Sequence, residues 1–270
     1  MEKSVIIVLF IVLLIAVLPT NALFASKGNK SLVNQDMVSA DSNNSSIVYD
    51  SNSSPFNISY ADWTEKWWQW TYSIPWNKNP SYDDTGEHCD ENQNGPVWFL
   101  TQAFEHPVER TCNIPQNTAL LITILNSECS YAEFKELKTE EELRECAKNI
   151  QDFVTGAKAS LNNITIPNID EYRIQTDLFN FTLPQDNILN LTAQTTQAVA
   201  DGNWLFLKPL PPGNYELKVK GEIDSKASAN ETGGNECHTR YAGRTGHCIL
   251  ERSETRCISF DKQSPQTRCG

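Results

Sequence analysis

The first 22 residues constrain the rest of the chain most, because they decide the compartment in which it folds. A short charged start precedes an unbroken apolar run from Val5 to Leu18, and Pro19 ends that run. This layout, followed by small residues up to Ala22, is typical of a secretory signal peptide, and the run is short for a membrane span. We expect cleavage after Ala22 or Ala25, with a retained N-terminal anchor as the alternative. The mature protein is therefore expected to be secreted or to lie on the extracellular face of the cell envelope.

Secretion makes the eight cysteines disulfide candidates, since proteins outside the cytoplasm fold under oxidising conditions. They form one group of four between positions 89 and 146 and another between 237 and 269. If each group pairs within itself, three pairings remain open for each. The expected disulfide residues are Cys89, Cys112, Cys129, Cys146, Cys237, Cys248, Cys257 and Cys269.

Metal binding is the alternative for these cysteines, because three of them have a histidine as a direct neighbour. The pairs are His88-Cys89, Cys237-His238 and His247-Cys248. Zinc sites usually contain two closely spaced ligand pairs such as C-x2-C, and the sequence has no such pair. Disulfides are therefore favoured, and we expect no metal at these thiols.

Composition divides the chain into four parts. Residues 1–22 are the signal peptide, and residues 23–55, rich in Ser and Asn, predict a flexible stalk. Residues 56–225 form the body, and residues 226–270 form a Cys-rich tail. The tail has a net charge of +2, whereas the whole chain carries −12. The overall acidity argues against nucleic acid as a partner, because phosphate backbones are repelled.

The N-x-S/T pattern for N-glycosylation is frequent and clusters in the predicted stalk, which fits a solvated tether. The candidate acceptors are Asn29, Asn43, Asn44, Asn52, Asn57, Asn163, Asn180, Asn190 and Asn230.

Two helices are predicted within the body. Ser59 and Asp62 are spaced as a capping box, and the first helix should run from there to about Ser73. A second capping box, Thr139 to Glu142, starts an apolar stripe at helical spacing, and this helix should end near Gly156.

Strands dominate the remainder of the body. Short apolar runs at 96–100, 119–125 and 204–207, and alternating patterns at 179–183 and 215–219, are bounded by turn residues. Because short turns rather than regular helices separate most of them, the pattern favours a mainly β fold. We expect an antiparallel β-sandwich, jelly-roll or immunoglobulin-like, with two inserted helices and a disulfide-stapled C-terminal tail.

The first predicted helix is unusually aromatic, with four tryptophans within eight residues. Tyr60, Trp63, Trp67 and Trp70 fall on one helix face, and the interpretation favoured for that face is packing on a sheet. Trp68 and Tyr72 lie off this stripe. They are therefore the candidates for binding a ligand, such as a sugar ring or the apolar groups of a partner.

A weak calcium motif follows in an acidic loop. Asp90, Asn92 and Asn94 place oxygens at alternate positions, and Gly95 stands at the bend. The twelfth position is Thr101 rather than Glu, and an apolar run fills the second half of the motif. A solvated loop anchored by a disulfide is the favoured interpretation. We therefore expect no cofactor, with calcium at this loop as the alternative.

No motif fixes a reaction, since G-x-S-x-G, H-E-x-x-H and phosphate-binding glycine loops are all missing from the sequence. We therefore favour a binding or structural protein without catalytic activity, whose partner is an extracellular ligand, a glycan or an envelope protein. The alternative is a secreted carbohydrate-active hydrolase that uses Asp and Glu, because a carboxylate pair needs no local motif. Contact with a membrane is expected only through a retained anchor.

Three segments carry a resemblance. W-x3-W-W-Q-W at 63–70, G-P-V-W-F-L at 95–100 and L-P-P-G at 210–213 resemble a group of secreted microbial proteins for which no activity is known. The resemblance covers about residues 60–222. It implies a single body domain and implies no function.

The tail is expected to be stapled by two internal disulfides and to be dispensable for folding of the body. Each disulfide would contribute on the order of 3 kcal/mol by restricting the unfolded chain. Peptide mapping without reduction and thermal melting of a chain ending at Asp224 test this. Cross-links between the two cysteine groups, or a truncated chain that fails to fold, would contradict it.

Overall fold

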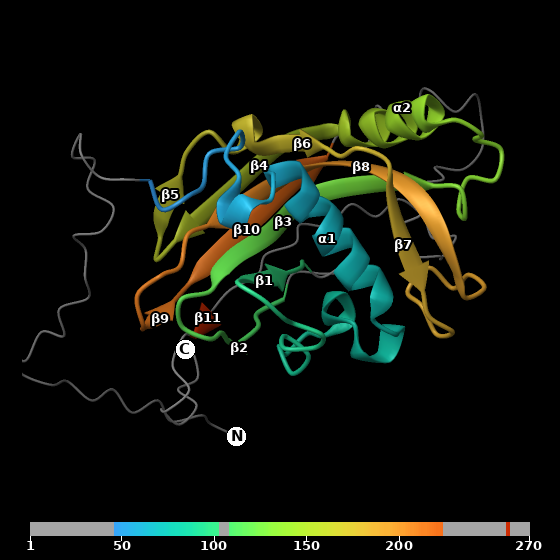
Figure 1. Ribbon diagram of the computed structural model, residues 1–270. Helices are drawn as coiled ribbons and strands as arrows, with labels where there is room; N and C mark the ends of the chain where they lie inside the picture. Colours follow the sequence, from blue (N-terminus) through green and yellow to red (C-terminus); the bar gives the residue numbers. More distant parts are fainter. Residues whose placement is uncertain (1–45, 103–107, 224–257, 260–270) are drawn as a thin grey trace, which may run out of the picture. The chain divides into compact units, whose positions relative to one another are not determined.

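The computed structural model describes residues 46–102, 108–223 and 258–259 (Figure 1). The described part is mainly β, with two α-helices and several short 3-10 helices. In chain order the elements are η2 (Pro55–Asn57), α1 (Tyr60–Ser73), η3 (Trp76–Lys78), η4 (Pro80–Tyr82), β1 (Val97–Leu100), β2 (Cys112–Asn113), β3 (Ala119–Ser130), α2 (Glu140–Gln151), β4 (Val154–Leu161), β5 (Ile164–Ile166), η5 (Ile169–Tyr172), β6 (Arg173–Gln175), β7 (Phe179–Leu183), β8 (Gln194–Leu207), β9 (Asn214–Tyr215), β10 (Leu217–Ile223) and β11 (Ile258–Ser259).

The central sheet has five strands and is built on the pairing of its two longest, β3 and β8. These run antiparallel, and their register extends from Leu120 opposite Leu207 to Ser130 opposite Ala198. β1 pairs with β3 in parallel, and β6 and β7 both pair with β8 in antiparallel orientation. The sheet is therefore mixed.

The two faces of the central sheet are covered by different elements. In β8, Trp204 and Phe206 pack in the cluster that contains α1, whereas Leu205 and Leu207 pack in the cluster that contains β4 and β10. Val199 is on the same side of the strand as Leu205 and packs with α2. Because side chains alternate along a strand, α1 covers one face, and α2 and the second sheet cover the other.

The second sheet has the order β10-β4-β5 and is antiparallel. Its strand β10 buries Leu217 and Val219 and leaves the intervening lysine half-buried, as the alternating pattern predicts. These side chains join Leu120 and Ile122 of β3 in one core cluster. Burial of this apolar surface holds the two sheets together.

Both predicted helix starts are confirmed. The Ser59 hydroxyl accepts a hydrogen bond from the Asp62 amide at the start of α1, and Thr139 and Glu142 form a complete capping box at the start of α2. The second helix ends at Gln151, not near Gly156. Val154 instead begins β4, because β-branched residues favour the extended backbone that pairs with β10.

The expectation of a mainly β body with two helices is confirmed, and the expectation of a purely antiparallel fold is wrong. β1 pairs with β3, and β2 pairs with β11, in parallel. Short parallel strands carry no feature in the sequence that separates them from antiparallel ones. The described residues contain no helix long and apolar enough to cross a membrane.

Parts of the predicted stalk and tail contact the body. Val48, within the predicted stalk, is 5% exposed and forms a β-bridge with Leu207. In the tail, β11 pairs with both β2 and β9. Truncation at Asp224 would therefore also remove the middle strand of this small sheet.

Replacement of Gly202 by alanine should destabilise the protein. A Cβ at Gly202 would lie 2.5 Å from Cβ and 2.8 Å from Cα of Asn126, beside the bulge in β3. We expect a loss of about 1–3 kcal/mol in the free energy of unfolding, because backbone must shift to relieve this overlap. Urea denaturation measures the change.

Gly156→Ala is the matched control, since Gly156 also lies in a strand but a Cβ there would meet nothing closer than 3.5 Å. This variant should be neutral or slightly stabilising. Equal losses in both variants would show that close packing at Gly202 is not the cause.

Candidate functional site

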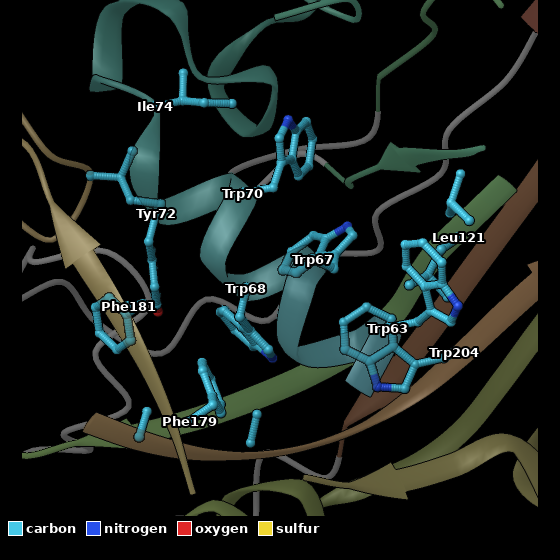
Figure 2. Close-up of a cluster of buried hydrophobic side chains, with 14 of the residues drawn as sticks. Trp63, Trp67, Trp68, Trp70, Tyr72, Ile74, Leu121, Phe179, Phe181 and Trp204 are labelled. Atoms are coloured by element: carbon cyan, nitrogen blue, oxygen red, sulfur yellow. The ribbon is translucent and has the colours of Figure 1, made fainter. Parts of the chain in front are cut away.

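The aromatic stripe of α1 is core, as predicted. Tyr60, Trp63, Trp67 and Trp70 are at most 6% exposed, and they pack on the face of the central sheet that carries Trp204 (Figure 2). Three indole N–H groups find backbone acceptors at 2.9 Å. Trp63 donates to the carbonyl of Pro55, Trp67 to that of Leu100 and Trp70 to that of Glu91.

Trp68 and Tyr72, the predicted ligand-binding pair, lie in the same core. They are 6% and 5% exposed, so their place off the stripe does not bring them to the surface. The physical reason is β7, which covers this side of α1. The ring centroid of Phe181 on β7 lies 4.6 Å from that of Tyr72, and the ring centroid of Trp68 lies 5.2 Å from that of Tyr72 (Figure 2). Neither ring offers a face to a ligand in this conformation. Ligand binding by this pair stays a prediction.

Tyr72 instead contacts a buried carboxyl cluster, formed by Glu128 and Glu133. Its Oη donates a 2.7 Å hydrogen bond to Oε1 of Glu128, a residue of β3 that is only 9% exposed. Glu133, in the turn after β3, lies beside Glu128 and accepts a 2.9 Å hydrogen bond from the Ser130 hydroxyl. Burial, and then the charge and hydrogen bond of Glu133, raise the pKa of Glu128 well above its ordinary value.

Asp62 and Glu65, two carboxylates of the aromatic helix, lie together on α1, whereas Asp83 lies in the loop after η4. Glu65 is half-buried on α1, where burial, followed by the charges of Asp62 and Asp177, raises its pKa to about 7. Asp83 organises a loop instead. Burial opposes its charge, but hydrogen bonds from the amides of His88, Thr85 and Gly86 and from the Thr85 hydroxyl lower its pKa overall.

The loop with the weak calcium motif is exposed. Asp90, Asn92 and Asn94 all face solvent, and Asn92 adopts a left-handed backbone with φ of 53°. Thr101, at the twelfth position, is buried and bonded to Ser81 and Gln102. Within residues 46–102 and 108–223, no three His, Cys, Asp or Glu side chains form a group that could hold a metal ion. Calcium binding here stays a prediction.

The same loop protects an edge of the central sheet, which the sequence reasoning missed. The side-chain amide of Gln93 donates to the carbonyl of Phe99 at 2.8 Å, and its oxygen accepts from the Phe99 amide at 3.0 Å. On the other edge, Gln69 of α1 donates to the carbonyl of Asn180 on β7 at 2.9 Å. Each glutamine occupies backbone groups that would otherwise be open to pairing with another chain.

The four body cysteines form two disulfides, Cys89–Cys112 and Cys129–Cys146. The first anchors the loop before β1, and the second ties α2 to β3. Of the three pairings left open for this group, the structure has the one that joins neighbours in sequence. The thiols of this group are therefore not metal ligands. Cys237, Cys248, Cys257 and Cys269 lie outside the described residues.

Every predicted glycosylation acceptor in the described part of the chain is exposed: Asn52, Asn57, Asn163, Asn180 and Asn190. The other four, Asn29, Asn43, Asn44 and Asn230, lie outside it. Solvent access is necessary for glycosylation, and exposed asparagines in turns are common in any protein. Glycosylation therefore stays a prediction.

Trp76 is the most exposed large apolar side chain that the structure describes, at 58%, and the sequence reasoning missed it. It lies on η3, directly after Pro75. Its backbone is held firmly: its amide donates to the carbonyl of Asp186 at 2.7 Å, and the side chain of nearby Asn79 donates to the carbonyl of Thr71 at 2.7 Å. The feature of the sequence that could have indicated its exposure is the position of Trp76 after the predicted helix, between the turn residues Pro75 and Asn77.

Replacement of Trp67 by phenylalanine should cost more stability than the same change at Trp68. Both indoles are buried on α1, but the Trp68 N–H has no hydrogen-bond partner among the described residues. Trp67→Phe also removes the donor to the carbonyl of Leu100. We expect its loss in unfolding free energy to exceed that of Trp68→Phe by about 1 kcal/mol. Urea denaturation gives the comparison, and equal losses would contradict the role of this hydrogen bond.

Comparisons with protein families, with curated proteins and with solved structures find no match for this chain. The resemblance carried by the three sequence segments stays a prediction. The function is therefore argued from the residues of this chain alone.

Proposed function

We propose that the protein is a secreted or envelope-associated binding protein without catalytic activity, and that Trp76 lies in its binding surface. The exposed indole of Trp76 carries the proposal. Tryptophan is enriched among residues that dominate binding energy, because it buries a large area and loses few rotamers. A tryptophan at 58% exposure gains nothing for the fold from most of its surface.

The surroundings of Trp76 favour a polar ligand with an apolar face. Three exposed polar residues lie near Trp76. Asn77 and Lys78 follow it in the chain, and Asp186 accepts a hydrogen bond from its backbone amide. Sugar rings combine an apolar face, which stacks on indole, with hydroxyls that amide and charged side chains bind. A glycan is therefore the ligand class that we propose first.

The compartment is part of the same proposal. Two disulfides in the body are compatible with an extracellular protein. Cleavage of the leader, glycosylation of exposed asparagines and a sandwich arrangement of the sheets are proposed with it. No cofactor is part of the proposal, and calcium at the Asp90 loop is its alternative. Each stands on the sequence patterns given above.

The alternative is a carbohydrate-active hydrolase, and one observation favours it. Glu128 and Glu133 lie side by side, and burial and then the charge of Glu133 raise the pKa of Glu128 well above its ordinary value, as in a general acid. Against this, Glu128 is 9% exposed, and Tyr72 occupies one of its oxygens. A substrate would have to displace packed side chains to reach it.

Replacement of Trp76 by alanine should weaken glycan binding about tenfold or more, since truncation of a central aromatic contact removes most of its stacking surface. A glycan array with the purified protein identifies the ligand, and titration of both proteins measures the loss. Phe56→Ala is the control and should bind like the wild type. Phe56 is also exposed, at 40%, but it lies before the start of α1, whereas Trp76 lies after its end.

Equal binding by the wild type and Trp76→Ala would contradict the proposed surface. Absence of any bound glycan would contradict the ligand class. Turnover of a polysaccharide that is lost in Glu133→Gln would overturn the non-catalytic proposal in favour of the hydrolase.

A further inference from the structure

The carboxyl cluster at Glu128 connects three segments of the fold. Tyr72 belongs to the last turn of α1, Glu128 and Ser130 end β3, and Glu133 belongs to the turn that follows. The hydrogen bonds from Tyr72 to Glu128 and from Ser130 to Glu133 join these segments in one continuous contact. We propose that Glu128 holds a proton that it donates in a hydrogen bond to Glu133, and that this contact holds the turn after β3 against α1, so that a rise in pH releases the turn.

A buried oxygen without a partner points to a proton on Glu128. Oε1 of Glu128 accepts from Tyr72, whereas Oε2 is buried and has no donor among the described residues. Two ionised carboxylates have only acceptors, so they cannot hydrogen-bond to each other. With one proton on Oε2 of Glu128, that oxygen becomes a donor to the Glu133 carboxylate. The buried oxygen is then satisfied.

The charged and buried groups around Glu128 also favour its protonated form. Burial and Glu133 hold the pKa of Glu128 well above its ordinary value, and the hydrogen bond from Tyr72 offsets this only in part. Tyr72 is itself kept neutral, because burial and then Glu128 raise its pKa; Glu133 and Tyr82 of η4 add to this. Among the described residues, no cation acts on Glu128, so none of them compensates a second negative charge when the proton leaves.

The sign of the pH effect follows from the raised pKa. Below the ordinary pKa of a glutamate, the folded and unfolded states both hold the proton, and the contact is fully stable. As the pH rises toward the raised value, the unfolded chain loses its proton first, and the advantage of the folded contact falls. Above the raised value, two carboxylates face each other in a buried place.

Glu133 is the partner able to move. Glu128 is fixed within β3 and Tyr72 within α1, whereas Glu133 is half-buried in a turn. That turn is held to the sheet by the hydrogen bonds of the Glu133 and Phe134 amides to the carbonyl of Ser130 and of the Tyr131 amide to Gln197. Repulsion is relieved when Glu133 swings into water, and this movement loosens residues 131–137.

Hydrogen exchange of the full chain tests the proposal. Protection factors for residues 131–137, corrected for the intrinsic exchange rate, should fall with rising pH in the wild type by up to about tenfold per pH unit, because one proton is released. Glu128→Gln should abolish this dependence, because its amide is neutral at every pH and keeps an acceptor for Tyr72. The control is Glu136→Gln, an exposed glutamate of the same segment, which should behave like the wild type.

A second variant keeps the test decisive if Glu128→Gln fails to fold. Glu133→Gln removes the facing charge and supplies an N–H donor for Glu128, so it should also flatten the pH dependence. Protection in the wild type that does not change with pH would overturn the proposal. An unchanged slope in either glutamine variant would overturn it as well.

Discussion

The antiparallel pairing of β3 with β8 is the constraint on which the rest of the structure depends. Both strands are buried along most of their length, so each face of their sheet must be covered by other parts of the chain. α1 covers one face with its tryptophans, and the β10-β4-β5 sheet and α2 cover the other. Removal of any cover would expose apolar side chains from the middle of the fold.

The helices and the second sheet that cover the central sheet also bury charged side chains, and these need hydrogen-bond or ion-pair partners. The link between α2 and the sheet shows this. Arg173 of β6 donates to both oxygens of Asp201 at 2.8 and 2.9 Å and contacts Asp152, at the end of α2, at 2.8 Å. The hydrogen bonds to Asp201 are the main reason that the pKa of Arg173 is raised. The Asp201 side chain is 4% exposed, so loss of Arg173 would leave a buried charge unpaired.

The sequence predicts what depends on local spacing. The capping boxes and apolar stripes place α1 and the start of α2, and the alternating residues place β7 and β10. It does not predict what depends on distant residues. The burial of Trp68 and Tyr72 requires β7, which lies more than a hundred residues further along the chain and reveals its position only in the folded sheet. The pairing of Glu128 with Tyr72 is hidden for the same reason.

The two sites that carry the proposals are linked by a single helix. Trp76 follows α1 by only three residues, and Tyr72 lies in the last turn of that helix. The indole hydrogen bonds of Trp63, Trp67 and Trp70 fix α1 along its length, and the contact of Tyr72 with Glu128 fixes its end. A binding residue gains affinity when its position is fixed before the ligand arrives, because less freedom is lost on binding. The buried carboxyl cluster therefore supports the end of α1, three residues before the exposed tryptophan, although neither proposal depends on the other.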